Sequence, residues 1–329
     1  MAEPGDEQRI FDAYAHLFEG DVDAPAPSPP TAATWTWRQA ANPAGARVLL
    51  ALDADEVVGL VCASGQPVLV NGEAARISRV DDIRIAPRFR HALGRPGLVV
   101  RMGEAWERAF GGMELDLISW GFPTPAAWRV LNWHVKVQAV RTQFKLVGQL
   151  EHLRIGEAGG LVAEPVERFD DDVEPLCARL AEGRGLTLAR DVVWLDWRFR
   201  QRPDQSYDQA VVRRGGEVVG LAVFRTGDFD GDRNVGLVCD WIVAPDDDGA
   251  ANALLAWLAE RARAAGCERL VLLLPETSPD WRPLQDRHGF LALRLAKRFL
   301  LADRSYAKQM RMHWLHQSWH YTFADTDFA

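Results

Sequence analysis

The order of apolar and polar residues predicts alternating groups of strands and helices along the chain. Residues Glu7 to Phe18 carry apolar side chains at helical spacing, and the proline-rich residues 24–30 then favour a loop. Strand-like apolar runs follow in two pairs, and the second pair flanks Asn71-Gly72, a strong hairpin signal. The expected strands are Arg47–Leu52, Val57–Ala63, Pro67–Val70 and Ala74–Ile85.

The pattern changes to that of a helix after Ile85-Ala86-Pro87. Apolar residues recur at every fourth position from Leu98 to Phe110, and two glycines end the run. The next expected elements are a strand over Met113–Trp120, a helix from Thr124 to about Trp133 and a strand over Lys136–Val147.

The second half of the chain repeats this order of elements. A strand, a long helix and a further strand form a parallel crossover, so we expect each half to be a mixed sheet with one parallel pair. The expected fold class is α/β, of the mixed-sheet α+β type, with two tandem domains over residues 1–156 and 157–329. The expected elements of the second half are Val162–Glu167, Asp170–Ala181, Gln209–Arg213, Glu217–Phe224, Arg233–Val243, Ala250–Ala265, Leu270–Leu274, Pro279–His288 and Arg294–Leu300.

Composition and charge narrow the class of protein. The 329 residues amount to about two domains of ordinary size. A formal net charge of −8 disfavours a nucleic-acid partner, because phosphate binding needs a basic surface. No apolar run is long enough to span a bilayer, and the acidic N-terminus is unlike a signal peptide. We therefore expect a cytoplasmic protein with no membrane partner.

The cysteines and histidines give no strong metal signal. The four cysteines are widely spaced, so we expect small buried thiols rather than a zinc knuckle or a disulfide framework. His313, His316 and His320 have the spacing of one helical face and could build a metal site with Asp325 or Asp327. Packing of a histidine- and tryptophan-rich segment is the preferred interpretation, and no metal is expected.

Several segments together resemble the GNAT (GCN5-related N-acetyltransferase) superfamily, in the form of its tandem two-domain bacterial members. Residues Val80–Val99 are similar to the family's strand that ends at a proline and leads through arginine and glycine into a long helix. Residues Trp120–Ala127 are similar to a Gly-Phe-Pro-Asn segment of tandem members. Residues Trp194–Arg198, Gln285–Phe290 and Tyr321–Asp327 also resemble the family, so the likeness covers nearly the whole chain.

The resemblance implies an acyl-CoA-dependent N-acyltransferase that uses acetyl-CoA or another acyl-CoA and acylates an amine by direct transfer in a ternary complex. The junction has suitable features, because the start of a helix binds a pyrophosphate and glycines let the backbone approach it. In the family the pantetheine arm pairs with the strand edge. The cofactor-binding residues that the resemblance implies are Ile83, Arg84, Ile85, Arg90, Gly94, Arg95, Gly97 and Leu98.

Both junctions depart from the family's pattern. The first is stretched and contains Pro96, which removes one N–H donor. The second has lost the arginine and the glycine pair, and it places Asp246, Asp247 and Asp248 where the pyrophosphate would lie. We therefore expect the first domain to bind acyl-CoA and the second to be structural or to shape the acceptor site.

The acid of the reaction is not identified by the sequence. The family's acid is a tyrosine that would fall at Leu131 in the first copy and at Gln285 in the second, and neither side chain can protonate a thiolate. Tyr321 is another tyrosine, and the sequence does not place it.

The expected catalytic base is Asp82. Because adjacent strand residues point to opposite faces, at most one of Asp81 and Asp82 can face the cleft, and Asp82 shares its face with Arg84 rather than with Ile83. Pairing of these carboxylates with neighbouring arginines, without a catalytic role, is the alternative.

Two other functions remain open. A non-catalytic GNAT-like small-molecule-binding protein would account for the missing tyrosine and the acidic second junction. An acyltransferase that depends on acyl-carrier protein would need a basic patch, for which Arg84, Arg88, Arg90 and Arg95 are candidates. The expected partner is a small-molecule or peptide amine acceptor of unidentified structure, and a homodimer is left open.

Overall fold

The computed structural model describes residues 5–17, 30–90, 97–295 and 300–328, which form two compact units. Unit 1 comprises Met1–Pro67, Ala75–Arg141 and Leu300–Met312, and unit 2 comprises Val68–Ala74, Thr142–Phe299 and His313–Ala329. The units interleave along the chain, so no single cut separates them. The expected domain boundary between residues 156 and 157 stays a prediction.

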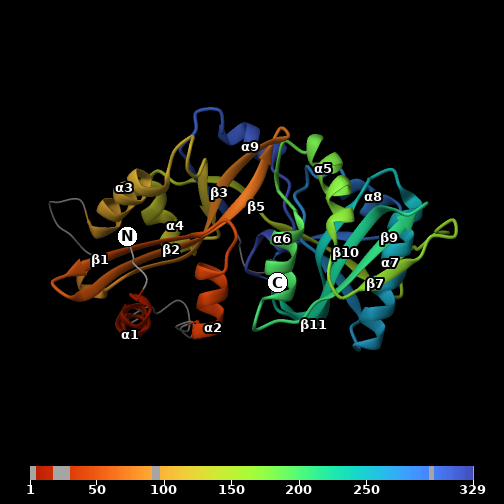
Figure 1. Cartoon of the computed structure of the whole chain (residues 1–329), viewed down its shortest axis with the longest axis horizontal. Helices are drawn as coiled ribbons and strands as arrows, with labels where there is room; N and C mark the ends of the chain where they lie inside the picture. The colour runs from red at the N-terminus through yellow and green to blue at the C-terminus, as the bar shows by residue number, and fades with distance from the viewer. Residues whose placement is uncertain (1–4, 18–29, 91–96, 296–299, 329) are drawn as a thin grey trace. The chain divides into compact units, whose positions relative to one another are not determined.

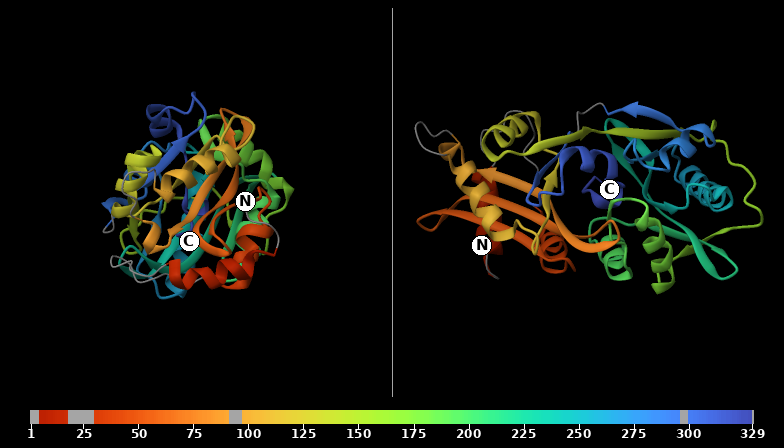
Figure 2. Two further views of the ribbon diagram at one scale, coloured as in Figure 1. Left: turned by 90° about the vertical axis from the view of Figure 1, so that its left-hand side faces the viewer. Right: turned by 90° about the horizontal axis from the view of Figure 1, so that it is seen from above.

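Unit 1 is built on a mixed sheet that carries helices on both faces. Helix α1 packs against one side of β1 and β2, and α3 packs against the other side of the same strands (Figure 1). The helix α3 runs along the sheet face in the view from above (Figure 2). The strand order is β1 (Ala46–Asp53), β2 (Glu56–Val70), β3 (Glu73–Ile85), β4 (Ile118–Gly121), β14 (Leu300–Ser305) and β5 (Gln138–Thr142).

The helices of unit 1 begin with polar caps where the sequence supplies them. Thr31 and Thr124 cap α2 and α4 by accepting the backbone N–H three residues ahead. Gly97 stands at the cap of α3 and has no side chain to fill that place. The helices are α1 (Glu7–Leu17), α2 (Ala32–Trp35) with the π-helix Thr36–Ala40, the 3₁₀ turn Pro87–Phe89, α3 (Leu98–Phe110), and α4 (Pro125–Val130) with the π-helix Leu131–Val135.

Unit 2 contains a second mixed sheet. Its order is β13 (Leu291–Arg294), β6 (Phe144–Gln149), β12 (Arg269–Leu272), β11 (Asp232–Val243), β10 (Glu217–Phe229), β9 (Asp208–Arg214) and β7 (Ala163–Val166). The last residues of β2 also belong to this unit and pair with β8 (Leu186–Leu188). Its helical segments are the turn Asp171–Val173, α5 (Glu174–Glu182), α6 (Val192–Leu195) with the π-helix Asp196–Arg200, α7 (Asp248–Ala264), α8 (Trp281–Asp286), α9 (Met312–Ser318) and the turn Phe323–Asp325.

The expected mixed α/β class and its parallel crossovers are confirmed. Strand β3 pairs in parallel with β4, and β11 pairs in parallel with β12. The expected hairpin at Asn71-Gly72 joins β2 to β3, and both residues have positive φ, 51° and 88°, as a tight hairpin turn requires.

Each unit takes one strand from the opposite half of the sequence, which the sequence did not predict. Residues Lys136–Val147 were expected to form one strand, but they form β5 in the first sheet and β6 in the second. Residues 296–299 of the expected strand Arg294–Leu300 lie outside the described residues. Its two ends belong to different strands, since β13 ends at Arg294 and β14 starts at Leu300. Strand β14 lies between β4 and β5 in the first sheet.

Three further expectations need correction. The runs Val57–Ala63 and Pro67–Val70 belong to one long strand, β2, because their apolar residues pack continuously. The strand expected over Met113–Trp120 is limited to its end, at β4. The short helices that contain Trp35 and Trp197 were not predicted, since each ends in a π-turn too short to show a helical period.

The parallel strands of both units carry the same irregularity. Val80, Ile83 and Ile85 of β3 all pack toward Met102 and Trp106, so Asp81 and Asp82 both lie on the opposite face. In β11, Val238 and Asp240 pair with neighbouring residues of β10, which leaves Cys239 as an extra residue. Such β-bulges reorient side chains and interrupt pairing beside functional sites.

Candidate active site

A cavity opens in unit 1 where β3 and β4 separate. The parallel pairing recorded between them is limited to Ser78 with Ser119 and Arg79 with Trp120, whereas β3 continues to Ile85. The cavity beyond this point has a volume of about 240 Å³. Its walls come from β3, β4, α3, α4 with its π-turn, and the residues at and after β14.

Mostly apolar side chains line the α3 side of this cavity, with the hydroxyls of Ser119 and Tyr306 among them. Ser119 Oγ accepts a hydrogen bond from Trp106 Nε1 at 2.9 Å and another from the Tyr306 hydroxyl at 3.2 Å, and it lies 2.9 Å from Ser78 Oγ. Burial raises the pKa of Tyr306 to about 12, the largest effect on it, so this hydroxyl holds its proton at neutral pH. Tyr306 can therefore act as a proton donor in the cavity.

Asp82 lies on the cavity wall at the bulge of β3. Its carboxylate forms an ion pair with Arg84 Nε at 2.8 Å and accepts a hydrogen bond from the Tyr14 hydroxyl at 3.4 Å. Burial raises the pKa of Asp82 to about 6 against the opposing effect of Arg84 and the hydrogen bond from Tyr14. A carboxylate with a pKa near neutrality is suited to accept a proton from an amine.

The neighbouring Asp81 has a different setting. Its carboxylate accepts a hydrogen bond from Ser64 Oγ at 2.6 Å and forms an ion pair with Arg79 Nη2 at 2.7 Å. The expectation that Asp81 and Asp82 point to opposite faces is wrong, because the bulge turns both carboxylates away from Ile83. The expected pairing with arginines is present at both positions. Both residues also line the cavity, so the expectation that at most one of them faces it is wrong.

Some of the described cofactor-binding candidates line this cavity, and others lie at the start of α3. Ile83, Arg84 and Ile85 line it from the part of β3 that extends beyond the recorded pairing with β4. Gly97 is the cap of α3 and Leu98 its first residue. Their roles toward a cofactor stay predictions.

Arg90 is engaged within the protein in a way that the sequence did not indicate. Its Nε donates to the Ile85 carbonyl at 2.8 Å and its Nη2 to the Leu17 carbonyl at 3.1 Å. These bonds hold the chain that leaves β3. Gly94 and Arg95 were also expected at the cofactor site, and both lie outside the described residues.

The acid position expected from the family pattern stays without a proton donor, and another residue offers one. Leu131 lines the cavity as an apolar side chain. Tyr306, which sequence reasoning missed, enters the same cavity directly after β14. Tyr321 is 1% exposed in unit 2, where its hydroxyl donates to Gln143 Oε1.

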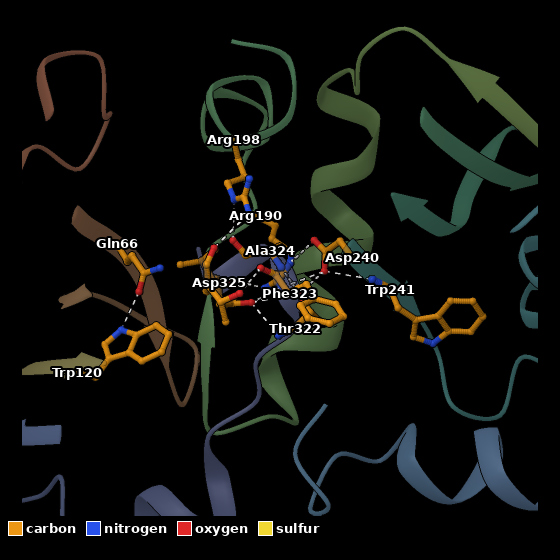
Figure 3. A network of polar contacts seen from close by, with 12 residues as sticks. Gln66, Trp120, Arg190, Arg198, Asp240, Trp241, Thr322, Phe323, Ala324 and Asp325 are labelled. Carbon is orange, nitrogen blue, oxygen red and sulfur yellow. Dashed lines mark hydrogen bonds and ion pairs between the residues drawn. The ribbon is translucent and has the colours of Figure 1, made fainter. Parts of the chain in front are cut away.

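The equivalent strand in unit 2 leads to a filled interior instead. Asp240 stands at the same distance before Ala244-Pro245 as Asp82 stands before Ala86-Pro87. Asp240 is 0% exposed and accepts hydrogen bonds from Arg190 Nε at 2.7 Å and from Thr322 Oγ1 at 2.9 Å (Figure 3). Arg190 also forms an ion pair with Asp325 at 2.9 Å. The C-terminal segment thus occupies the space beside this bulge.

The helix start that would bind a pyrophosphate in unit 2 is also occupied. Asp247 caps α7 by accepting the Ala250 N–H, and two bonds of 2.9 and 2.8 Å join it to Arg214. Asn252 in the first turns of α7 exchanges hydrogen bonds with the Gly156 N–H and the Glu157 carbonyl. A carboxylate and a chain segment therefore already lie where the phosphates would bind.

The histidines near the C-terminus differ in exposure. His313 is exposed on α9, and His320 is buried. Among the described residues, no three histidine, cysteine, aspartate or glutamate side chains are placed to hold a metal ion. In the same part of the chain, no helix is both long and apolar enough to cross a membrane.

Comparisons with known proteins agree with this architecture. Residues 176–290 match the model of the acetyltransferase (GNAT) family. The chain resembles the structure of a GCN5-related N-acetyltransferase from Anabaena variabilis ATCC 29413, with 14% identity, 93% of this chain and 71% of that chain covered, and a TM-score of 0.62. No curated protein sequence matches the chain.

Two other solved structures share the fold. Eis1 from Mycobacterium abscessus has 14% identity over 98% of this chain and 81% of that chain, with a TM-score of 0.59. Saccharomyces cerevisiae N-myristoyltransferase, solved with bound myristoyl-CoA, has 12% identity over 89% of this chain and 82% of that chain, with a TM-score of 0.51. Together these findings confirm the resemblance to the GNAT superfamily and the two-sheet fold.

Proposed function

We propose that this chain, which has a GNAT fold, is an acyl-CoA-dependent N-acyltransferase whose active site lies in unit 1. The observation that carries the proposal is the separation of β3 from β4 at the bulge of Asp81 and Asp82, with a cavity of about 240 Å³ at that place. A slot between two parallel strands offers backbone groups to an extended pantetheine arm, as the edge of a sheet does to a peptide. The acyl group would then lie among the apolar residues of the α3 side.

The start of α3 supports unit 1 as the acyl-CoA site. Gly97 contributes no side chain at the cap, so no cap side chain competes with an anion for the first N–H groups of the helix. In unit 2, Asp247 occupies the corresponding position at the start of α7 and brings a negative charge. The pyrophosphate of acyl-CoA is thus favoured at α3 and opposed at α7.

Asp82 is the proposed base and Tyr306 the proposed acid. In its ionised form Asp82 takes the proton of the acceptor ammonium, and the free amine attacks the thioester carbon. A carbon–nitrogen bond forms, the carbon–sulfur bond breaks, and the Tyr306 hydroxyl gives its proton to the leaving thiolate. The amine nitrogen then loses its second proton, which restores the Tyr306 hydroxyl and leaves a neutral amide. Asp82 belongs to β3 and Tyr306 follows β14, and both residues line the same cavity.

The acceptor is proposed to be a primary amine, of a small molecule or a peptide, and acetyl-CoA is the first donor to test. Dependence on acyl-carrier protein has less support, because three of the four arginines that would form its docking patch have partners within the chain. The fourth, Arg95, lies outside the described residues. Arg84 pairs with Asp82, Arg88 with Glu56, and Arg90 with two backbone carbonyls.

Ligand-dependent stabilisation tests the proposal. A ligand that binds the folded chain raises its melting temperature, so acetyl-CoA or a longer acyl-CoA should do so in a concentration-dependent manner. Hydrolysis or transfer of the acyl group should then be measured with a panel of amines. Stabilisation without transfer to any amine would favour a non-catalytic binding protein. Transfer from acyl-carrier protein but not from acyl-CoA would favour an acyltransferase that depends on acyl-carrier protein.

A further inference from the structure

A second cavity lies within unit 2, and none of the functions discussed above uses it. Its volume is about 140 Å³, well beyond the ~10–15 Å³ that one water molecule needs. Three segments line it: the turn between α5 and β8, the loop between β12 and α8, and the end of α9 with the residues that follow. Gly183 and Gln317 on its wall are exposed, so the cavity reaches the surface of this unit.

The wall of this cavity contains a buried arginine. The Arg184 side chain is 4% exposed, and its Nη2 donates to Asp280 Oδ2 at 3.0 Å. Ser278 Oγ donates to the same carboxylate oxygen at 3.2 Å, which fixes that partner in place. A guanidinium has five N–H donors. Among the described residues Arg184 uses one of them, in the bond to Asp280, and the others remain for a ligand.

His320 is another buried polar residue of the cavity wall. It is 3% exposed, and neither Nδ1 nor Nε2 has a hydrogen-bond partner within the described part of the chain. A buried polar group without a partner costs free energy, so such a group beside a cavity favours a polar ligand there. Its backbone is held firmly, since the His320 N–H donates to the Leu186 carbonyl at 2.8 Å.

The charges that act on His320 are positive. Burial, then Arg184 and Arg190, lower the pKa of His320 well below its usual range. The carboxylates of Asp280 and of Asp240 and Asp325 pair with these arginines, and none of them offsets the effect at the ring. A negatively charged group at His320 would therefore relieve both the missing hydrogen bond and the positive field.

We propose that this cavity of unit 2 binds a small oxyanion, a carboxylate or a phosphate group, between Arg184 and His320. The neutral His320 ring donates one N–H to the oxyanion, and Arg184 contributes charge-assisted hydrogen bonds. Because the ligand contacts three segments that are distant in the sequence, its binding stabilises the attachment of the C-terminal segment in unit 2. This site is independent of the cavity in unit 1.

The test measures binding of two probes to the full chain. Inorganic phosphate and acetate are each titrated by calorimetry at constant ionic strength, and the ¹⁵N shifts of the His320 ring are followed in parallel. Saturable binding of one probe or both, with a shift of the His320 ring signals, is the expected result. Phosphate alone points to a phosphorylated ligand, and acetate alone points to a carboxylic acid.

Matched variants locate the binding. His320→Phe keeps a ring of similar volume without donors, and it should weaken binding about tenfold or more, as expected for the loss of one hydrogen bond to a charged group. His313→Phe makes the same change at an exposed position of α9 and should bind like the parent chain. Arg184→Lys keeps the charge beside Asp280 and should weaken binding as well.

Two results would overturn the inference. One is the absence of saturable binding of either probe to the parent chain. The other is binding that His320→Phe leaves unchanged, provided that circular dichroism shows this variant to be folded.

Discussion

Asp82 and Asp240 stand at the same place in the bulged strands of the two units, yet Asp82 lines a cavity and Asp240 is fully buried in an ion pair with Arg190. Burial raises the pKa of Asp82 to about 6. Asp240 receives two hydrogen bonds from Arg190 and one from Thr322. The same position of the fold thus holds a cavity-lining carboxylate in unit 1 and a buried ion pair that binds the C-terminal segment in unit 2.

Replacement of Asp82 by Asn should abolish most of the acyl transfer. General bases contribute about 100- to 10,000-fold to a rate, and a loss in this range is expected in kcat while acyl-CoA binding stays unchanged. Steady-state kinetics and calorimetry measure the two quantities. A variant that keeps more than half of the parent kcat would show that another group takes the proton.

The rate should rise with pH as Asp82 ionises. Because the base acts in its carboxylate form, kcat/KM should increase as the pH passes upward through about 6, the raised pKa of this group. The measurement is a pH–rate profile with an acceptor whose own pKa is known, so that its ionisation can be separated. A profile that is flat between about pH 5 and about pH 7, roughly one pH unit on each side of this pKa, contradicts the assignment.

Tyr306→Phe should reduce turnover and leave the fold intact. The change removes only the hydroxyl that donates to Ser119 and keeps the ring that packs against Gly111. We expect kcat to fall about 100-fold, as for the loss of a general acid, with little change in the dissociation constant of acyl-CoA. Rates with thioesters of more acidic thiols check the role, because a better leaving group should restore part of the loss in this variant.

Gly97→Asp should give α3 the negative cap that Asp247 gives to α7. The carboxylate would accept the first N–H groups of the helix and repel a pyrophosphate, so acyl-CoA binding should weaken about tenfold or more. Gly97→Ala is the control, because it adds the Cβ atom without the charge. Equal affinities of the two variants would show that the phosphates bind elsewhere.

Asp303 predicts a pH dependence of stability that is separate from catalysis. The residue is 1% exposed on β14, and burial raises the pKa of Asp303 from 3.8 to about 7. The folded state then holds a proton that the unfolded state releases, so stability falls as the pH rises from about 4 to about 7. Asp303→Asn should remove this slope and stabilise the protein at about pH 8 by roughly 2–4 kcal/mol.

The control for this prediction is Asp55→Asn at an exposed turn. Urea unfolding of both variants at several pH values gives the slopes. An unchanged slope in the Asp303→Asn variant would mean that another group is responsible for the pH dependence.

Arg190→Met should be the most destabilising of these changes. It leaves two carboxylates, Asp240 and Asp325, buried without their cation, which typically costs about 3–5 kcal/mol. The same replacement at the exposed Arg200 is the control. Hydrogen exchange should also accelerate in residues 322–326, and a loss of stability under about 1 kcal/mol would contradict a structural role for this ion pair.

The sequence predicted most elements because their signals are local. Helix α3 shows a four-residue period from Leu98 to Phe110, and the Asn71-Gly72 turn needs only two residues to be recognised. The exchange of β6 and β14 between the sheets was not predictable in this way. An apolar strand has the same pattern whichever sheet it joins, so its partner depends on contacts between distant residues.

The active-site prediction was limited by the same cause. Asp82 was chosen over Asp81 on the assumption of regular alternation, which the bulge breaks, and both residues line the cavity. Tyr306 was missed because it follows β14, a strand from the far end of the chain. Arg90 was expected at the cofactor, and its bonds to the Ile85 and Leu17 carbonyls depend on a close approach that spacing does not reveal.

The most direct test of the central claim is a crystal structure of the full chain grown with CoA or acetyl-CoA. The account predicts that the pantetheine arm lies between β3 and β4 of unit 1, with the pyrophosphate at Gly97 and Leu98 and the thiol end near Asp82 and Tyr306. Cofactor bound between β11 and β12 of unit 2, at the start of α7, would contradict the assignment of the active site to unit 1.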